Sequence, residues 1–97
     1  MISQSEIIKL IAENKPFLKN KFGVEKIGIF GSYAKNNFSE SSDIDVLIEL
    51  REQKYDFWVS VKLYLEKLLG KPVDLIATGS HLRKGFLTTI NKDIIYV

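Results

Sequence analysis

The chain has 97 residues, of which 45% are hydrophobic and 27% charged, so we expect one folded domain spanning residues 1–97 and exclude a disordered segment. It contains no cysteine, which excludes disulfides, zinc–thiolate sites and a cysteine nucleophile. A chain without cysteine is most simply assigned to a reducing compartment, and no apolar run reaches the roughly 18 residues of a membrane helix, so we expect a cytoplasmic protein without membrane binding. The formal net charge is only +2, so we expect no stable nucleic-acid binding.

An amphipathic helix is predicted at the start of the chain. Ser3 followed by Glu6 has the pattern of a capping box, and Gly23 is suited to end the helix. Pro16 lies within this segment, where we expect it to kink or restart the helix. The apolar stripe recurs at steps of four and seven and consists of Ile7, Ile11, Leu18 and Phe22.

Two strands joined by a polar connection are predicted next. Residues 26–30 form a short run rich in β-branched and aromatic side chains, which is typical of a buried strand. Gly31-Ser32 follows, and the polar residues 33–42 predict a short helical turn and then a loop. The second strand is predicted over residues 44–50.

A second long helix has the clearest periodicity in the chain. Asp56 is its predicted N-cap, and Gly70 with Pro72 closes it. Its apolar positions at helical spacing are Phe57, Trp58, Val61, Leu65, Leu68 and Leu69. The basic residues Lys62, Lys67 and Lys71 are interpreted as its solvated face.

The remaining sequence completes a layered fold. A third strand is predicted over residues 73–77, a last helix from Ser80 to about Ile90, and a fourth strand over residues 94–97. The alternation of strands and helices predicts an α/β (α+β) fold, with a small mixed β-sheet flanked by helices.

Three carboxylates occupy unusual positions on the predicted strands. Asp43 and Asp45 are separated by one residue, so their side chains should leave the same face of a strand with Cα atoms ~6.6 Å apart. Asp74 lies alone in the apolar strand 73–77, where a charge is costly unless it is paired or binds a metal. Three such carboxylates can hold two divalent ions for phosphoryl or nucleotidyl transfer, and their oxygen ligands suit Mg²⁺ or Mn²⁺.

Gly31-Ser32 lies where a strand ends and a helical turn begins. A glycine there lets the backbone approach a ligand, while free N–H groups and the Ser32 hydroxyl can hold phosphate oxygens. The alternative is a plain turn in which Ser32 is only the N-cap of the following helix.

The combination of these motifs resembles the polymerase-β-like nucleotidyltransferase superfamily, and in particular its minimal nucleotidyltransferase (MNT) branch. The glycine–serine pair precedes Asp43-x-Asp45 by ten residues, across a strand–turn–strand. The matching segments are Phe30-Gly-Ser-Tyr-Ala34, Ser42-Asp-Ile-Asp-Val-Leu47, Lys71-Pro-Val-Asp-Leu-Ile76 and the closing residues 90–97.

The resemblance implies the nucleotidyltransferase fold and a role for each site residue. Gly31 and Ser32 would hold the triphosphate of the substrate, most often ATP in this branch. Asp43 and Asp45 would be ligands of two Mg²⁺ ions, and Asp74 would be the third carboxylate, which binds one ion and helps to activate the acceptor hydroxyl.

The chain departs from the family pattern just after the glycine–serine pair. Family members often place a basic residue where this chain has Tyr33 and a glycine where it has Asn36, so Lys35 is the nearest basic residue. Asparagine tolerates a left-handed turn, so the loop can keep its shape. Lys35 is interpreted either as a phosphate contact or as a solvated lysine.

The resemblance also implies a partner and an activity. The expected reaction is Mg²⁺-dependent transfer of AMP from ATP to a hydroxyl, a tyrosine in the expected case, of a helical HEPN toxin, for which the MNT chain is the antitoxin. Two alternatives stay open. One is a non-catalytic binding module that neutralises the same partner by contact, and the other is nucleotidyl transfer to a small molecule or an RNA end.

Overall fold

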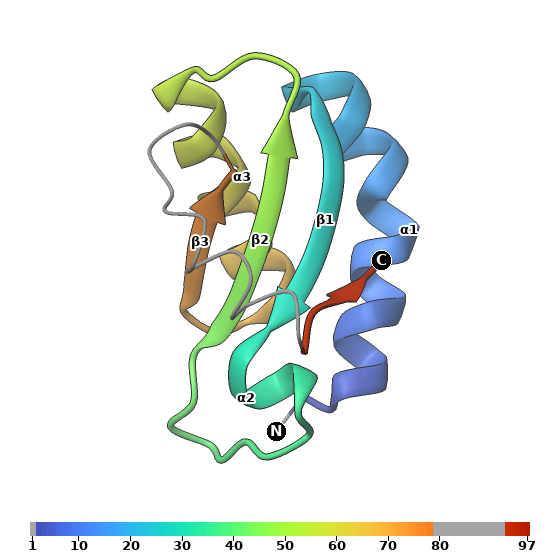
Figure 1. Ribbon diagram of the computed structural model, residues 1–97, viewed down its shortest axis with the longest axis vertical. Helices are drawn as coiled ribbons and strands as arrows, with labels where there is room; N and C mark the ends of the chain where they lie inside the picture. Colours follow the sequence, from blue (N-terminus) through green and yellow to red (C-terminus); the bar gives the residue numbers. More distant parts are fainter. Residues whose placement is uncertain (1, 79–92) are drawn as a thin grey trace.

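The computed structural model describes residues 2–78 and 93–97 (Figure 1). In chain order the elements are α1 (Gln4–Phe22), β1 (Val24–Phe30), α2 (Gly31–Ala34), β2 (Ile44–Leu50), α3 (Tyr55–Leu69), β3 (Val73–Ala77) and β4 (Ile95–Tyr96). The strands form a mixed sheet in the order β3-β2-β1-β4, in which β2 and β3 are parallel and the other neighbours are antiparallel. This arrangement confirms the predicted fold class.

Helix α1 begins and ends as predicted. Ser3 accepts a hydrogen bond from the Glu6 backbone N–H, and the Glu6 carboxylate accepts one from the Ser3 N–H at 3.3 Å, which completes the capping box. Gly23 ends the helix in the left-handed conformation at φ 72°. Pro16 does not restart the helix, because α1 continues through it as one helix with Pro16 exposed on its outer side.

The strands agree closely with the sequence pattern. β2 and β3 have the predicted bounds, and β4 lies within the predicted residues 94–97. β1 begins at Val24, two residues before the predicted start, because Val24 is fully buried directly after the helix cap. The predicted helix over residues 80–90 lies outside the described residues.

Helix α3 begins earlier than its best capping residue suggests. Lys54 is the N-cap, and its carbonyl accepts from the backbone N–H groups of Phe57 and Trp58. The prediction of Asp56 as N-cap is therefore wrong. Asp56 lies in the first turn of the helix instead, where its negative charge interacts favourably with the helix dipole.

The main core lies between one face of the sheet and the helices α1 and α3, which also pack against each other (Figure 1). Ile44, Val46 and Ile48 of β2 are fully buried in this core. Because successive strand side chains alternate between faces, Asp45 takes the opposite face of the sheet. In the described part of the chain, no helix is long and apolar enough to cross a membrane.

Candidate active site

Strand pairing brings two of the three predicted carboxylates together. Asp45 of β2 and Asp74 of β3 are direct partners in the parallel register. On the other side of β2, Asp45 is paired with Phe30, the last residue of β1. Gly31 therefore begins α2 beside the Asp45 carboxylate, at the end of the sheet where α2 lies in Figure 1.

Gly31 is in direct contact with Asp45. Its backbone has φ +70°, and a Cβ built on it would overlap the Asp45 carboxylate oxygen Oδ2 and lie 3.0 Å from Cγ. From the sequence, a glycine was expected here so that the backbone could approach a ligand. The structure adds a second reason for glycine, which is its contact with Asp45. No side chain fits at this position unless the Asp45 carboxylate moves.

Ser32 is not the N-cap of the short helix. It is the second residue of α2, and the N-cap position belongs to Phe30, which makes no side-chain capping bond. The alternative interpretation of Ser32 as a helix cap is therefore wrong. The Ser32 carbonyl accepts from the Asn37 backbone N–H at 2.8 Å, which folds the following loop back on the turn.

The acidic cluster has an unfavourable electrostatic environment. Burial, then the negative charge of Asp74 and a hydrogen bond with it, and then the charge of Asp43 raise the pKa of Asp45 to about 6. A cation between these groups would relieve both the repulsion and the lost solvation, so the donor set fits Mg²⁺.

Asp43 is placed differently from its two companions. It precedes β2 instead of lying within it, and it is exposed. Across residues 2–78 and 93–97, no three Asp, Glu, His or Cys side chains are arranged as a ready metal cage. The assignment of metal ligands therefore stays a prediction, which the proximity of Asp45 and Asp74 favours.

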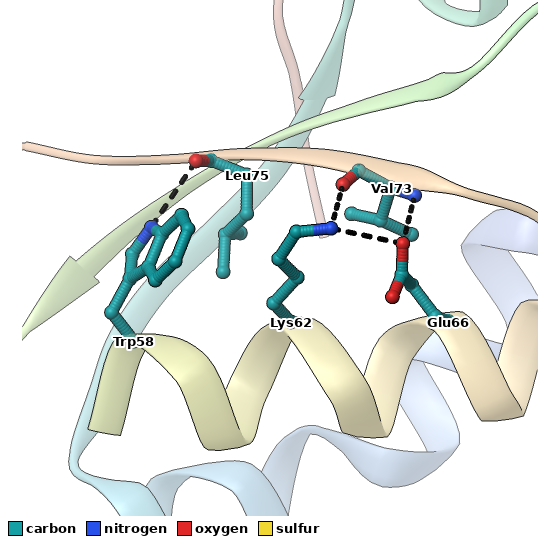
Figure 2. A network of polar contacts seen from close by, with 5 residues as sticks. All are labelled: Trp58, Lys62, Glu66, Val73 and Leu75. Carbon is teal, nitrogen blue, oxygen red and sulfur yellow. Dashed lines mark hydrogen bonds and ion pairs between the residues drawn. The ribbon is translucent and has the colours of Figure 1, made fainter. Parts of the chain in front are cut away.

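Side chains of α3 hold the outer edge of β3, the strand that carries Asp74 (Figure 2). The Trp58 indole N–H donates to the Leu75 carbonyl at 3.1 Å. Lys62 Nζ donates to the Val73 carbonyl at 3.1 Å and to Glu66 Oε2 at 2.9 Å. The Val73 N–H donates to the same Glu66 oxygen at 3.0 Å.

This network protects an edge strand that would otherwise expose backbone groups to another chain. It also fixes the peptide units next to Asp74. The Val73 N–H, and after it Lys62, holds the pKa of Glu66 below its usual range. Lys62 was predicted to lie on a solvated helix face, and that prediction is wrong because its amino group bonds to the strand.

The Trp58 bond can be tested by stability. Trp58→Phe should lower the free energy of unfolding by about 1 kcal/mol, because the Leu75 carbonyl loses its donor. Tyr55→Phe is the matched control, since Tyr55 stacks on Trp58 but is exposed. It should change stability by less than about 0.5 kcal/mol. Urea unfolding measures both variants. A Trp58→Phe variant as stable as wild type would show that the indole hydrogen bond does not support the edge strand.

Sequence reasoning missed a second polar cluster, at the other end of the glycine–serine turn. Tyr33 is fully buried, and its ring stacks on Phe38 with centroids 4.0 Å apart. Its hydroxyl accepts from Lys71 Nζ at 3.0 Å, and the same amino group donates to the Glu40 carbonyl at 3.0 Å. Lys71 is therefore not a solvated lysine, contrary to the prediction. Gln4 Nε2 donates to the Tyr33 carbonyl at 2.8 Å from α1.

The structure also places the residues near the turn where the chain departs from the family pattern. Asn36 has φ 57°, which confirms that asparagine takes the left-handed conformation expected of it. Lys35 is largely exposed, with its Nζ 3.7 Å from Asp93 Oδ2. A phosphate contact by Lys35 stays a prediction.

Comparison with known proteins agrees with this geometry. Residues 12–97 match the family model described as "Polymerase beta, Nucleotidyltransferase". A protein adenylyltransferase MntA of Thermococcus cleftensis is 36% identical over 98 residues, covering 100% of this chain and 98% of its own.

Two solved structures share the fold. One, described as a minimal nucleotidyltransferase, has a TM-score of 0.74 at 27% identity and covers 92% of this chain and 93% of its own. The other comes from a complex of an MNT antitoxin with a tri-AMPylated HEPN toxin of Shewanella oneidensis. Its TM-score is 0.59 at 20% identity, with 96% of this chain and 66% of that chain covered. The chain is an enzyme of the polymerase-β nucleotidyltransferase family and belongs to its minimal branch, whose members include protein adenylyltransferases.

Proposed function

We propose that this protein transfers AMP from ATP to a tyrosine hydroxyl of a HEPN toxin in the cytoplasm, depends on Mg²⁺, and acts as the antitoxin of that toxin. The observation that carries the proposal is the pairing of Asp45 and Asp74 against the Gly31 turn. The names of the relatives support the choice of substrate and partner.

In the proposed reaction one bond to the α-phosphorus forms and another breaks. The acceptor oxygen forms a bond to the α-phosphorus of ATP, and the bond from that phosphorus to the bridging oxygen breaks, so pyrophosphate leaves with the electron pair. Bound Mg²⁺ would neutralise the charge that develops on the phosphate oxygens. Asp43, Asp45 and Asp74 would hold it.

The chain's own residues have separable roles. Backbone N–H groups at Gly31 and the Ser32 hydroxyl would orient the triphosphate. Asp74, exposed at the sheet edge beside Asp45, would accept the proton of the acceptor hydroxyl. Its exposure suits a group that must meet an acceptor carried on another protein.

The direct test is labelling of a HEPN partner with ATP that is radiolabelled on its α-phosphate. Wild-type protein with Mg²⁺ should label the partner, and Asp43→Asn or Asp45→Asn should reduce labelling by at least 100-fold, because several kcal/mol of charge stabilisation is lost. Asp56→Asn, an exposed carboxylate on α3, is the matched control and should retain activity.

Different outcomes separate the alternatives. Unchanged labelling in excess chelator would contradict Mg²⁺ dependence. Neutralisation of the toxin by Asp45→Asn without labelling would favour the non-catalytic binding module. Label appearing on an RNA end or a small molecule, and not on the protein partner, would favour the remaining alternative.

A further inference from the structure

We propose that Lys71 is a positioning residue, which ties α2, with its phosphate-binding turn, and the loop leading to Asp43 to the start of the strand carrying Asp74. The consequence for catalysis rests on the proposed function. The tie itself rests on contacts within the described chain and can be measured without substrate.

Lys71 stands at a junction between two separate parts of the site. It lies three residues before Asp74, just ahead of β3. Its amino group reaches across to α2 and to the loop that follows it, where it donates to the hydroxyl of Tyr33 in α2 and to the carbonyl of Glu40 in the loop, both at 3.0 Å. One side chain thus bonds to both ends of the 33–40 segment.

The Tyr33 end of this tie is rigid. The ring is fully buried, stacks on Phe38 and has the Lys71 amino group 5.3 Å from its centroid. Gln4 holds the Tyr33 and Ala34 carbonyls from α1, at 2.8 and 3.0 Å. Tyr33, the residue after Ser32, is therefore anchored through both its backbone carbonyl and its side chain.

The Glu40 end is weakly held apart from Lys71. Residues 39–42 are exposed or half-buried, and their local bonds are made mainly among serines, such as the Ser42 N–H to the Ser39 carbonyl at 3.0 Å. This stretch leads directly into Asp43. Loss of the lysine should therefore make the loop residues before Asp43 more mobile, while the packed Tyr33 stays in place.

Hydrogen exchange of backbone amides is the first measurement. In Lys71→Met, which keeps most of the side-chain volume, the amides of residues 37–42 should exchange about threefold to tenfold faster, the range expected when one or two hydrogen bonds are lost. Lys71→Arg keeps a donor and should restore most of the protection. Lys67→Met, on the exposed face of α3, is the matched control and should leave exchange unchanged.

Nucleotide binding is the second measurement, made by calorimetry with ATP and Mg²⁺. Lys71→Met should raise the Kd for ATP about threefold to tenfold, with Lys71→Arg close to wild type. Tyr33→Phe removes only the hydroxyl acceptor, and in the Lys71→Met background it should add little, because both changes break the same bond.

The role of Lys71 and the proposed function would be contradicted by different results. Unchanged exchange of residues 37–42 in Lys71→Met would overturn the tie. Faster exchange with an unchanged Kd for ATP would overturn its importance for the site. Absence of ATP binding by the wild-type protein would instead contradict the proposed function, while the exchange result would still decide whether Lys71 holds the loop.

Discussion

Replacing Gly31 with alanine is expected to abolish AMP transfer and to lower the free energy of unfolding by about 2–4 kcal/mol. Two costs add. A residue with a Cβ at φ +70° costs about 1–2 kcal/mol, and the new methyl group would overlap the Asp45 carboxylate. Because Asp45 must move to admit the methyl group, its alignment with Asp74 is lost, and with it the proposed metal site.

Gly70 provides a matched control for the backbone cost. It has the same φ of +70°, but a Cβ built there meets no atom within 4 Å. Gly70→Ala should therefore report only the left-handed strain, and the excess cost of Gly31→Ala should report the overlap with Asp45. Thermal or urea unfolding measures both.

A double variant tests the cause of that excess. In an Asp45→Ala background, Gly31→Ala should cost little more than Gly70→Ala, because the overlapping carboxyl oxygens are gone. If Gly31→Ala and Gly70→Ala are equally destabilising in the wild-type background, the contact with Asp45 is not energetically important.

Much of the fold could be predicted from residue patterns. The bounds of β2 and β3 were predictable because apolar, β-branched runs are set off there by polar residues and by Pro72. The start of α3 was not, because Asp56 is by type a better N-cap than Lys54. The helix instead has Lys54 as its N-cap, which makes no side-chain capping hydrogen bond, so side-chain preferences do not reveal this start.

Some features of the candidate site could likewise be predicted from the sequence, and others could not. The convergence of Asp45 and Asp74 could be expected from their positions on apolar strands, once the strands were placed side by side. The contact of Gly31 with Asp45 could not, because it depends on the register that sets Phe30 opposite Asp45. A one-residue change of register would have moved Asp45 to the other face of the sheet.

The two structural lysines escaped prediction for a related reason. Lys62 and Lys71 have the spacing of a solvated helix face, yet each amino group reaches a backbone carbonyl of a distant segment. Long lysine side chains can place their charge several ångströms from the backbone position that a periodic pattern describes. Such contacts depend on tertiary placement, which the sequence pattern does not contain.

Replacing Asp45 with asparagine is expected to stabilise the metal-free protein at neutral pH. The folded-state pKa of Asp45 is about 6 against an ordinary value of 3.8, so the folded protein binds this proton more readily than the unfolded chain does. The resulting penalty is absent below about pH 4, grows as the pH rises through 6, and is complete above it. The asparagine variant keeps the shape but lacks this penalty.

The expected gain is about 2 kcal/mol at pH 8 in chelator, less than the ~3 kcal/mol that a shift of this size represents, because Asp45 is partly exposed and solvent screens part of the repulsion. The gain should shrink toward zero as the pH falls to 4. Asp74→Asn should also stabilise the protein, since it removes the main charge acting on Asp45. Asp56→Asn, the control on α3, should give no gain, because it removes a favourable helix-dipole contact.

Millimolar Mg²⁺ should reverse this order. Only the intact carboxylates bind the ion well, and binding stabilises the folded state by mass action, so wild type should melt above both asparagine variants. Thermal melts of the four proteins at pH 4 and pH 8, in chelator and in Mg²⁺, provide the full comparison. If Asp45→Asn melts below wild type in chelator at pH 8, the carboxylates are satisfied structural groups. In that case their repulsion does not reflect a site built for a cation.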